Sequence, residues 1–431
     1  MWRRGLPTLL WSSSNRASRD ERAQRLEAAN ASLKIMRQAQ MGAVTLPRQL
    51  TERVEFTLEP APELSQLREQ WRDLERRANP SFFQTWDWLG CWVEEARLSP
   101  LVLIGRQMGR GVLMALLERS NQRRYMVIET NALLLHHLGD KDRDILCIAY
   151  NGFLMDAQLS SSAIGDAISF LFSRSGCGPT ETTPRWLEEF HMKGVPREYE
   201  EHPEVPGLNR VVLSRHMSWK VDLEGIRSSG KGYLEHLSSN TRYQIRRSIK
   251  RYKERGQLRA DRAATVEEAL ECLEALKDLN KAYWQKRGQT PAFAYPFFES
   301  FHKRLIRETL PRGTVELLRV TVGNRPIGYL YNFVHQGWVY AYHSAFVYED
   351  DPKLKPGLVC HVLCIERHLK ERAHSYDFMA GDSRYKANLG TPGVEMLDVT
   401  YQRPLLKLRA ENILRTIKRD LRIRLQKFAR Q

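Results

Sequence analysis

The chain has 431 residues, of which 42% are hydrophobic, 10% aromatic and 27% charged. This composition is that of a globular protein and excludes collagenous, fibrous and fully disordered chains. The sequence contains no run of about 18 apolar residues, so it predicts no transmembrane segment. Six scattered cysteines do not form the framework of a disulfide-rich protein. We therefore expect a folded protein of the cytoplasm.

The net charge of +16 is concentrated in three segments. Lys and Arg outnumber acids by nine to three in residues 1–50, by eight to one in 240–259 and by ten to two in 403–431. The rest of the chain is mildly acidic. This pattern indicates local attraction to anions such as nucleotides, tRNA or phospholipid headgroups. Solvated helix faces are the plainer interpretation of each segment.

Residues 1–50 differ from the rest of the chain. They are rich in arginine and serine, and their apolar stretch is short and broken by Pro7. A secretory signal needs a longer apolar stretch. We interpret the segment as a mobile or targeting-like leader and predict no element from it.

From residue 51 the apolar residues recur at regular spacing. Leu64, Leu67, Trp71 and Leu74 lie three or four residues apart, which is the spacing of one helix face. Two apolar stretches on either side of 108–111 predict a hairpin. This half predicts helices at 63–77 and from Thr85 onward, strands at 101–105, 112–117, 125–129 and 144–148, and a helix at 160–173.

The second half of the chain repeats this order. Thr265 and Glu268 form a capping box that starts a helix. Gly323 marks a turn between two strands. This half predicts helices at 240–255, 265–287, 295–308 and 358–373, and strands at 315–322, 327–334, 338–347 and 376–379.

Both halves therefore offer helices, then two strands joined by a glycine turn, then a further strand and a helix. We interpret the chain as two related lobes of an α/β fold with a mixed sheet and additional helices. The predicted segments are the leader at 1–50, an N-terminal lobe at 51–215, a C-terminal lobe at 216–402 and a basic amphipathic helix at 403–431. That last helix lies on the inner face of an anionic membrane or packs on its own domain or on a partner.

Four short motifs are spread over most of the chain. They consist of Phe83, Gln84, Trp86 and Trp88; Asn240, Arg242, Arg246 and Arg247; Pro356 and Gly357; and Gly381, Asp382, Tyr385, Lys386 and Gly390. Together with the order of the elements, they resemble the GNAT acyltransferase fold and, within it, the CelD-type proteins of cellulose biosynthesis and the FemAB-like aminoacyl ligases. The resemblance implies tandem GNAT-like lobes. It also implies transfer of an acyl or aminoacyl group from a thioester or ester to an amine or hydroxyl, in envelope or exopolysaccharide biosynthesis.

Such a transfer needs a positioned donor, hydrogen bonds to the developing oxyanion and removal of a proton from the nucleophile. The resemblance makes Asp382 the candidate base or amine-orienting group, Tyr385 the proton donor and Lys386 the partner of an oxyanion or phosphate. Tyr342 is a further catalytic candidate, and His343 is a substrate-binding candidate on the same strand. The plainer interpretations are a turn aspartate, a surface lysine and aromatic residues packed on a sheet.

The donor is expected at the start of the helix that follows Lys353 and Lys355. The N–H groups of Gly357 and Leu358 and the two lysines suit a phosphate there. Members of the family that bind coenzyme A carry more glycines in this loop, and Pro356 has no N–H to donate. Acyl-CoA and aminoacyl-tRNA therefore both remain candidate donors.

Arg242 and Arg246 lie one helical turn apart, and with Arg247 they form a candidate binding site for a phosphate or carboxylate of the substrate. A basic helix of this kind also suits tRNA. Trp86 and Trp88 are candidates for a substrate groove, or else core residues.

The spacing of Cys360, Cys364 and His368 resembles that of zinc ligands, but three stacked helix positions cannot all reach one ion. We therefore predict no metal. An alternative to the enzyme is a non-catalytic module that binds RNA or a nucleotide-linked glycan. A second alternative is a scaffold held on a membrane by the last helix.

Overall fold

The structure is a computed structural model that describes residues 53–125, 127–173, 187–201, 204–381 and 383–428. The predicted leader at 1–50 lies outside these ranges. Residues 54–428 belong to one compact unit. Every described helix is too short or too polar to cross a lipid bilayer.

The first half of the described chain contains two helices after its first strand and a three-stranded meander after them. Its elements are β1 (Glu55–Pro60), α2 (Leu64–Glu75), α3 (Trp86–Glu95), β2 (Leu101–Gln107), β3 (Arg110–Arg124), β4 (Ile128–Leu135), β5 (Leu154–Met155), α4 (Ser162–Phe172), β6 (Glu189–Pro196), α5 (Glu198–Glu201) and β7 (Asn209–Asp222).

The second half repeats this order after two linking helices. Its elements are α6 (Leu223–Ser229), α7 (Ser239–Lys253), β8 (Leu258–Arg262), α8 (Val266–Gln285), α9 (Pro296–Thr309), β9 (Val315–Val322), β10 (Arg325–His335), β11 (Trp338–Phe346), α10 (Pro356–Lys370), β12 (Ser375–Ala380), α11 (Arg384–Leu389), β13 (Thr391–Gln402) and α12 (Leu406–Phe428).

The sheet itself shows the repeat. Its strand order is β1-β2-β3-β4-β6-β13-β7-β12-β11-β10-β9-β8, with β5 paired to β3. Each half contains four antiparallel strands, and the last of them pairs in parallel with a fifth strand. This parallel pair is β4 with β6 in the first half and β11 with β12 in the second. The final strand of each half is exchanged, because β7 pairs with β12 and β13 pairs with β6. The prediction of tandem mixed α/β lobes is confirmed, and we call the two halves of the sheet with their helices the N-terminal and C-terminal lobes.

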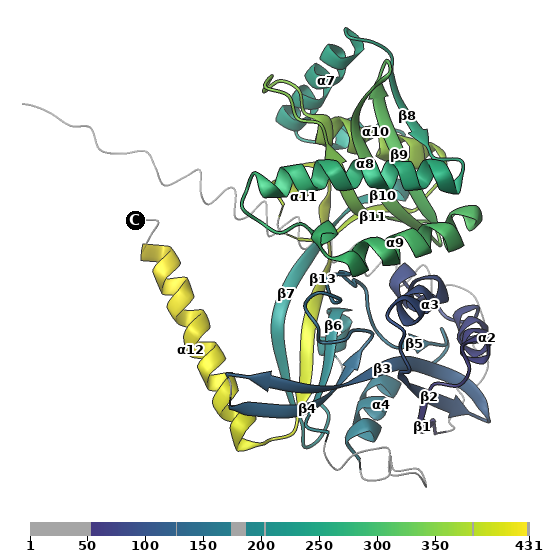
Figure 1. Cartoon of the computed structure of the whole chain (residues 1–431), viewed down its shortest axis with the longest axis vertical. Coiled ribbons are helices and arrows are strands. Elements are labelled where there is room, and N and C mark those ends of the chain that lie inside the picture. The colour runs from purple at the N-terminus through teal and green to yellow at the C-terminus, as the bar shows by residue number, and fades with distance from the viewer. Residues whose placement is uncertain (1–52, 126, 174–186, 202–203, 382, 429–431) are drawn as a thin grey trace, which may run out of the picture. The chain divides into compact units, whose positions relative to one another are not determined.

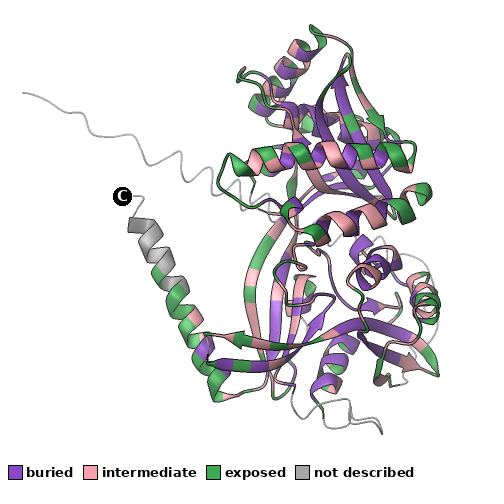
Figure 2. Cartoon of the chain, in the orientation of Figure 1, coloured by how far each residue is buried: buried purple, intermediate pink, exposed green. Residues whose placement is uncertain are grey.

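Three apolar cores cover the sheet. The largest core is shared by the lobes and contains residues of α2, α3, α8 and α9. A second core places α4 on the N-terminal lobe, and a third places α7 and α10 on the C-terminal lobe. Figure 1 shows α8 and α9 in green next to the strands of their lobe, and Figure 2 shows the buried residues of these strands.

Local sequence explains where several helices begin. The side chain of Thr265 caps α8 by accepting a hydrogen bond from the N–H of Glu268. The Glu268 carboxylate accepts its bond from the N–H of Ala264 and not from that of Thr265, so the second bond of the predicted capping box is displaced by one residue. Ser238 caps α7 in the same way, by accepting from the N–H of Thr241. Pro356 occupies the first position of α10, where its missing N–H leaves no helical bond unmade.

Two strand predictions need correction. The strand expected at 125–129 begins later and runs over Ile128–Leu135 as β4, and the strand expected at 144–148 is wrong because these residues form turns and loop. The carboxylate of Asp144 accepts hydrogen bonds from the N–H groups of Leu138 and Gly139, which fold this segment back on itself. Leu146 is buried in the shared core, so its apolar character reflects packing and not strand pairing.

Candidate active site

β11 and β12 separate from each other in the C-terminal lobe. They pair only over 338–340 and 375–377. Beyond this point, residues 341–346 of β11 keep a paired neighbour on β10 alone. β12 turns away through 378–380, where Met379 has a φ of 61°. We call the space between these two segments the wedge. Its β11 edge presents backbone groups to which no described strand is bonded, and such groups need other partners.

An aromatic cluster fills one side of the wedge. His361 of α10 is buried and stacks on Tyr385 of α11, with ring centroids 5.5 Å apart and planes 15° apart. Phe346 and Phe378 pack on the same imidazole at 5.7 and 5.1 Å. The Nδ1 atom of His361 lies 3.0 Å from the hydroxyl oxygen of Tyr376. Burial, with a smaller effect of the Lys386 charge, lowers the pKa of His361 to about 3, so its ring is neutral.

Tyr385 is the sequence-predicted catalytic residue that reaches this cluster. The residue is 37% exposed, so it reaches solvent while its ring stacks on His361. Burial raises the pKa of Tyr385 to about 12. The hydroxyl therefore keeps its proton at neutral pH and can donate a hydrogen bond or a proton, but it is a poor base.

Lys386 has a positioning contact with the backbone. Its ammonium group is buried and donates to the carbonyl oxygen of Ala380 at 2.8 Å and to that of Met379 at 3.4 Å. These bonds hold the end of β12 in its turned course at the wedge. Asp382, the first catalytic candidate from sequence, lies outside the described residues.

Tyr342 and His343 lie on β11, on the face of the sheet opposite to Tyr385. A β-bulge in β11 lets both side chains point to one face, since Tyr331 pairs with His343 and Asn332 with Ala341. Tyr342 packs at 4.7 Å on Phe333, in the shared core. The structure thus brings these two candidates together but on the other side of the sheet from Tyr385.

The loop before α10 has few backbone N–H groups left to bind a pyrophosphate. The N–H of Lys353 donates to the carboxylate of Asp351, and that of Leu354 donates to the Asp351 carbonyl oxygen. The N–H of Lys355 donates to the hydroxyl of Ser248 on α7 at 2.9 Å. Three successive amides are therefore occupied, and a carboxylate lies among them.

The first turn of α10 offers fewer donors still. Pro356 has no N–H, which leaves Gly357 and Leu358 as the donors that a helix start provides. The fold family implies coenzyme A at this place. With three amides bonded and an acidic group in the loop, the residues present do not fit its pyrophosphate, whose binding relies on free backbone N–H groups.

The arginines predicted to bind substrate lie on the outer face of α7. Arg242, Arg246, Arg247 and Lys250 line a shallow groove of about 370 Å³, and the exposed ring of Tyr243 lies between them. The guanidinium carbon of Arg247 lies 5.2 Å from the centre of this ring. Because Ser248 of the same helix bonds the loop before α10, this basic face belongs to an element that borders the predicted donor site.

Trp86 and Trp88 are core residues. Their exposed fractions are 4% and 2%. The ring of Trp88 packs on Phe83 of its own lobe at 4.9 Å and on Phe301 of α9 at 4.7 Å. A ring enclosed in this way has no free face for a substrate. Trp88 thus joins the lobes, and Trp86 packs on Trp71 of its own lobe at 6.4 Å, so neither ring lines a groove.

Sequence reasoning missed a buried carboxylate at the base of the wedge. Asp377 of β12 is fully buried, accepts a hydrogen bond from the hydroxyl of Tyr150 and accepts another from the N–H of Met379. The Tyr150 hydroxyl also lies 3.0 Å from the hydroxyl oxygen of Ser218 on β7. The signal was present, because Asp377 is the one charged residue in the apolar stretch Ser375–Ala380.

The ionisation of Asp377 should make stability depend on pH. Burial raises its pKa to about 6, well above the unfolded value near 3.9. A raised folded pKa adds stability that is complete below about pH 4 and is lost as the pH rises through about 6, an effect of about 3 kcal/mol. We expect Asp377→Asn to remove this slope. Urea unfolding of both proteins from pH 4 to 8 tests it, and parallel curves would contradict the assignment.

The equivalent place in the N-terminal lobe is closed by its own chain. β4 and β6 pair in parallel as far as Leu135 and Met192. Directly beyond this pair, the amide nitrogen of Asn151 donates to the carbonyl oxygens of Leu135 at 3.2 Å and Lys193 at 3.0 Å. Its amide oxygen lies 2.7 Å from Nδ1 of His136. Among the described residues of the C-terminal lobe, no side chain bridges β11 and β12 in this way, so the open wedge is there.

A second group that sequence reasoning missed borders the wedge. Tyr348 follows β11 and is 59% exposed, and its ring stacks on Tyr283 of α8 at 5.8 Å. The guanidinium of Arg287 lies over the ring of Tyr283, 3.6 Å from the ring centre. Exposed aromatic and guanidinium groups of this kind can stack on planar groups of a ligand.

Cys364 and His368 do lie near a carboxylate, that of Glu316 on β9, with their ligand atoms within 4.8 Å of one another. Glu316, however, is paired with Arg262 at 2.5 Å and accepts from Asn332 at 3.1 Å. His368 lies 3.1 Å from the same carboxylate. The carboxylate is thus already neutralised by a cation and hydrogen-bonded, as a buried charge must be.

The comparisons with known proteins agree with this geometry. Residues 239–387 match the family model described as an acetyltransferase (GNAT) domain. No curated protein matches the sequence. Among solved structures the chain is similar to FemX, with 10% identity, a TM-score of 0.53 and coverage of 81% of this chain and 98% of that chain. At this identity the likeness supports the fold alone.

Two other solved structures are similar at lower TM-scores. L-PGS from Bacillus licheniformis has 12% identity and a TM-score of 0.46, with 85% of this chain and 99% of that chain covered. A tandem GNAT protein from the clavulanic acid biosynthesis pathway has 11% identity and a TM-score of 0.42, with 81% and 99% covered. The family match spans the wedge and α10. Residues 239–387 therefore form a GNAT domain, and the chain is an acyltransferase.

Proposed function

We propose that the chain transfers an acyl or aminoacyl group from a polyanionic ester, of which aminoacyl-tRNA is the natural example, to an amine or hydroxyl at the wedge. The observation that carries this choice of donor is the loop before α10, where the three successive amides of Lys353, Leu354 and Lys355 are already bonded. A coenzyme A thioester loses its usual pyrophosphate site there. A donor held elsewhere by many phosphates does not need it.

The backbone of residues 341–346 supplies donors for the carbonyl oxygen of the bound ester. As the amine or hydroxyl attacks, this oxygen gains negative charge, and unpaired N–H groups at a wedge stabilise it without reorganising. The nucleophile loses its proton to Asp382. The leaving oxygen takes a proton from Tyr385, whose raised pKa keeps that proton available. Lys386 supports the transfer by holding the turn of β12.

The basic face of α7 is the proposed contact for the donor phosphates. Arg242, Arg246, Arg247 and Lys250 line one groove, and Tyr243 offers a ring on which a base can stack. The helix borders the loop before α10 through Ser248 and Lys355. The acceptor class, an envelope or exopolysaccharide precursor, rests on the likeness of the sequence motifs to the CelD-type branch.

Binding of tRNA at several salt concentrations tests the donor assignment. We expect Arg246→Ala/Arg247→Ala to weaken binding and to lower the slope of log affinity against log salt by about 1.5, since each lost phosphate contact removes about 0.7–0.9. Lys281→Ala/Lys286→Ala, at the C-terminal end of α8 and at the residue that follows it, is the matched control for total charge. Filter binding measures both variants.

Three outcomes distinguish the alternatives. Saturable binding of coenzyme A by calorimetry, with transfer from acetyl-CoA that the α7 variant leaves unchanged, would overturn the polyanionic donor. Binding of tRNA without transfer of its aminoacyl group to any amine would favour the non-catalytic RNA-binding module. Transfer from aminoacyl-tRNA that falls in the α7 variant supports the proposal.

A further inference from the structure

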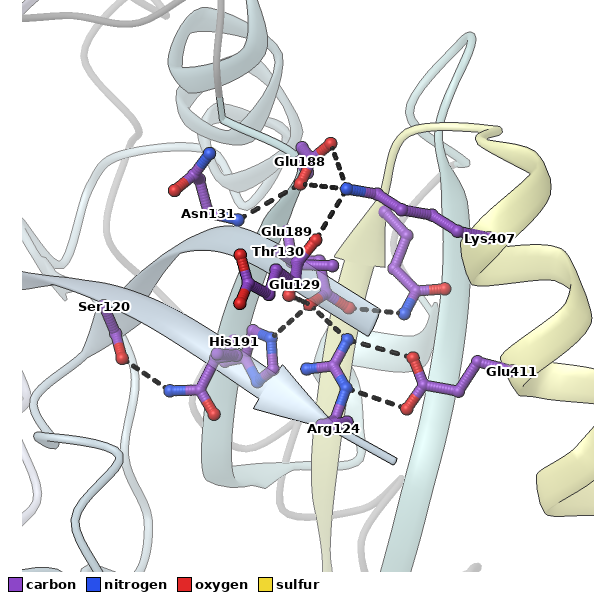
Figure 3. Close-up of polar contacts among 12 residues, drawn as sticks. Ser120, Arg124, Glu129, Thr130, Asn131, Glu188, Glu189, His191, Lys407 and Glu411 are labelled. Atoms are coloured by element: carbon purple, nitrogen blue, oxygen red, sulfur yellow. Dashed lines mark hydrogen bonds and ion pairs between the residues drawn. The ribbon is translucent and has the colours of Figure 1, made fainter. Parts of the chain in front are cut away.

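α12 is attached to the N-terminal lobe by its polar face. Glu411 is fully buried, and its carboxylate lies 2.8 Å from Nε of Arg124 on β3. Lys407, one turn earlier, pairs with Glu188 at 2.8 Å. Figure 3 shows both pairs, with Lys407 and Glu411 reaching from α12 toward the ends of β3 and β6. The contact is thus made by charged groups together with the buried side chain of Leu408.

A buried network fixes this attachment. Arg124 also pairs with Glu189 at 2.6 Å, and Glu189 accepts hydrogen bonds from Thr130 and from the amide of Gln402 at 2.5 and 2.7 Å. Burial alone would raise the pKa of Glu189, but the hydrogen bond from His191 and the nearby cations hold it below its ordinary value. The anchor is therefore ionised at neutral pH, and it determines which face of α12 turns outward.

The outward face is apolar. Its side chains stand seven, one, three and four residues apart, which places them on one side of a helix with 3.6 residues per turn. They are Leu406, Ile413, Leu414, Ile417 and Leu421, with exposed fractions of 82%, 61%, 45%, 50% and 53%. We call these five residues the outer stripe. The helix is thus oriented opposite to that of an ordinary surface helix, which buries its apolar face (Figure 2).

Charge selects among the surfaces that could cover the outer stripe. Residues 406–428 contain eight Lys and Arg against two acids. A second copy of α12 carries the same excess, and residues 1–50 have nine basic residues against three acids, so both would be repelled. A bilayer that contains anionic lipids combines an apolar interior with a negative surface.

We propose that α12 lies on the surface of an anionic phospholipid bilayer, with the outer stripe at the boundary between headgroups and acyl chains. Helices with one apolar face and an excess of Lys and Arg bind in this way. The network around Arg124 then fixes the N-terminal lobe to the membrane surface. This proposal does not depend on which donor the wedge uses.

Sedimentation of the full chain with lipid vesicles tests the proposal. Vesicles of phosphatidylcholine alone are compared with vesicles of equal parts phosphatidylcholine and phosphatidylglycerol. We expect binding to the second kind only, weakening as salt is added. Ile413→Gln/Ile417→Gln should lower the affinity at least about tenfold, because it removes two apolar side chains from the boundary without changing charge. Thr416→Gln, beside Ile417 but outside the stripe, should bind like the parent chain.

Several results would overturn the proposal. These are equal binding to both vesicles, no effect of the double variant, or binding only after residues 1–50 are removed, which would assign the stripe to that segment. A dimer in light scattering that the double variant converts to monomer would assign it to a second copy. Transfer to a small water-soluble amine should be unchanged in the double variant, so failure here is distinct from failure of the proposed reaction.

Discussion

Replacing Tyr385 with phenylalanine is expected to lower the rate of acyl transfer by about 10²–10³-fold, the effect of losing a positioned general acid. The stack on His361 is made by the ring, which phenylalanine retains, so folding should be unchanged. The loss should appear in kcat and not in donor affinity, since the hydroxyl acts on the leaving oxygen. Single-turnover transfer from aminoacyl-tRNA measures the chemical step directly.

Tyr348→Phe is the matched control for this experiment. Tyr348 also lies at the wedge and loses one hydroxyl, but it is 59% exposed and has no assigned proton to give. We expect its rate to stay within about threefold of the parent chain. Asp382→Asn, the companion variant, should abolish transfer with folding intact. Full turnover in Tyr385→Phe would remove the acid from the proposed mechanism, and full turnover in Asp382→Asn would remove the base.

Replacing Trp88 with alanine should destabilise the protein by about 3–5 kcal/mol. The ring is 2% exposed and lies between Phe83 and Phe301, which belong to different lobes, so its removal leaves a cavity at their contact. The free energy of urea unfolding measures the effect.

Tyr243→Ala is the control for a large aromatic residue without such packing. Its side chain is 61% exposed, and we expect a change within about 0.5 kcal/mol. The comparison also decides between the two interpretations of the tryptophan motif. A small loss of stability in Trp88→Ala together with a large loss of substrate affinity would return Trp88 to a binding role.

Local features of the sequence predicted most of the described helices correctly, because such features depend on nearby residues. The helix cap at Thr265 and the three- and four-residue spacing around Trp71 are of this kind. Six strands of the sheet, β1, β5, β6, β7, β8 and β13, were not predicted. The apolar run at 144–148 was misread, since Leu146 packs in a core while its backbone turns. A short apolar run has the same sequence pattern whether its residues are buried in a loop or paired in a strand.

The geometry of the candidate site depends on features that no short sequence pattern marks. Alternation along β11 would place Tyr342 and His343 on opposite faces, and the bulge that unites them inserts one residue that the sequence does not mark. The bond from Tyr150 to Asp377 joins residues of different lobes. The contacts that occupy the loop amides likewise come partly from Ser248, more than a hundred residues earlier.

The exchange of β7 and β13 between the lobes restricts how this chain can be divided. If it were cut between the lobes, each fragment would lose the strand that completes its sheet and would expose a row of unpaired peptide groups. Such fragments would bind each other through these strand edges or aggregate. Mutual completion of this kind also opposes the free swinging of one lobe about a linker, because the motion would have to twist a continuous ladder of hydrogen bonds.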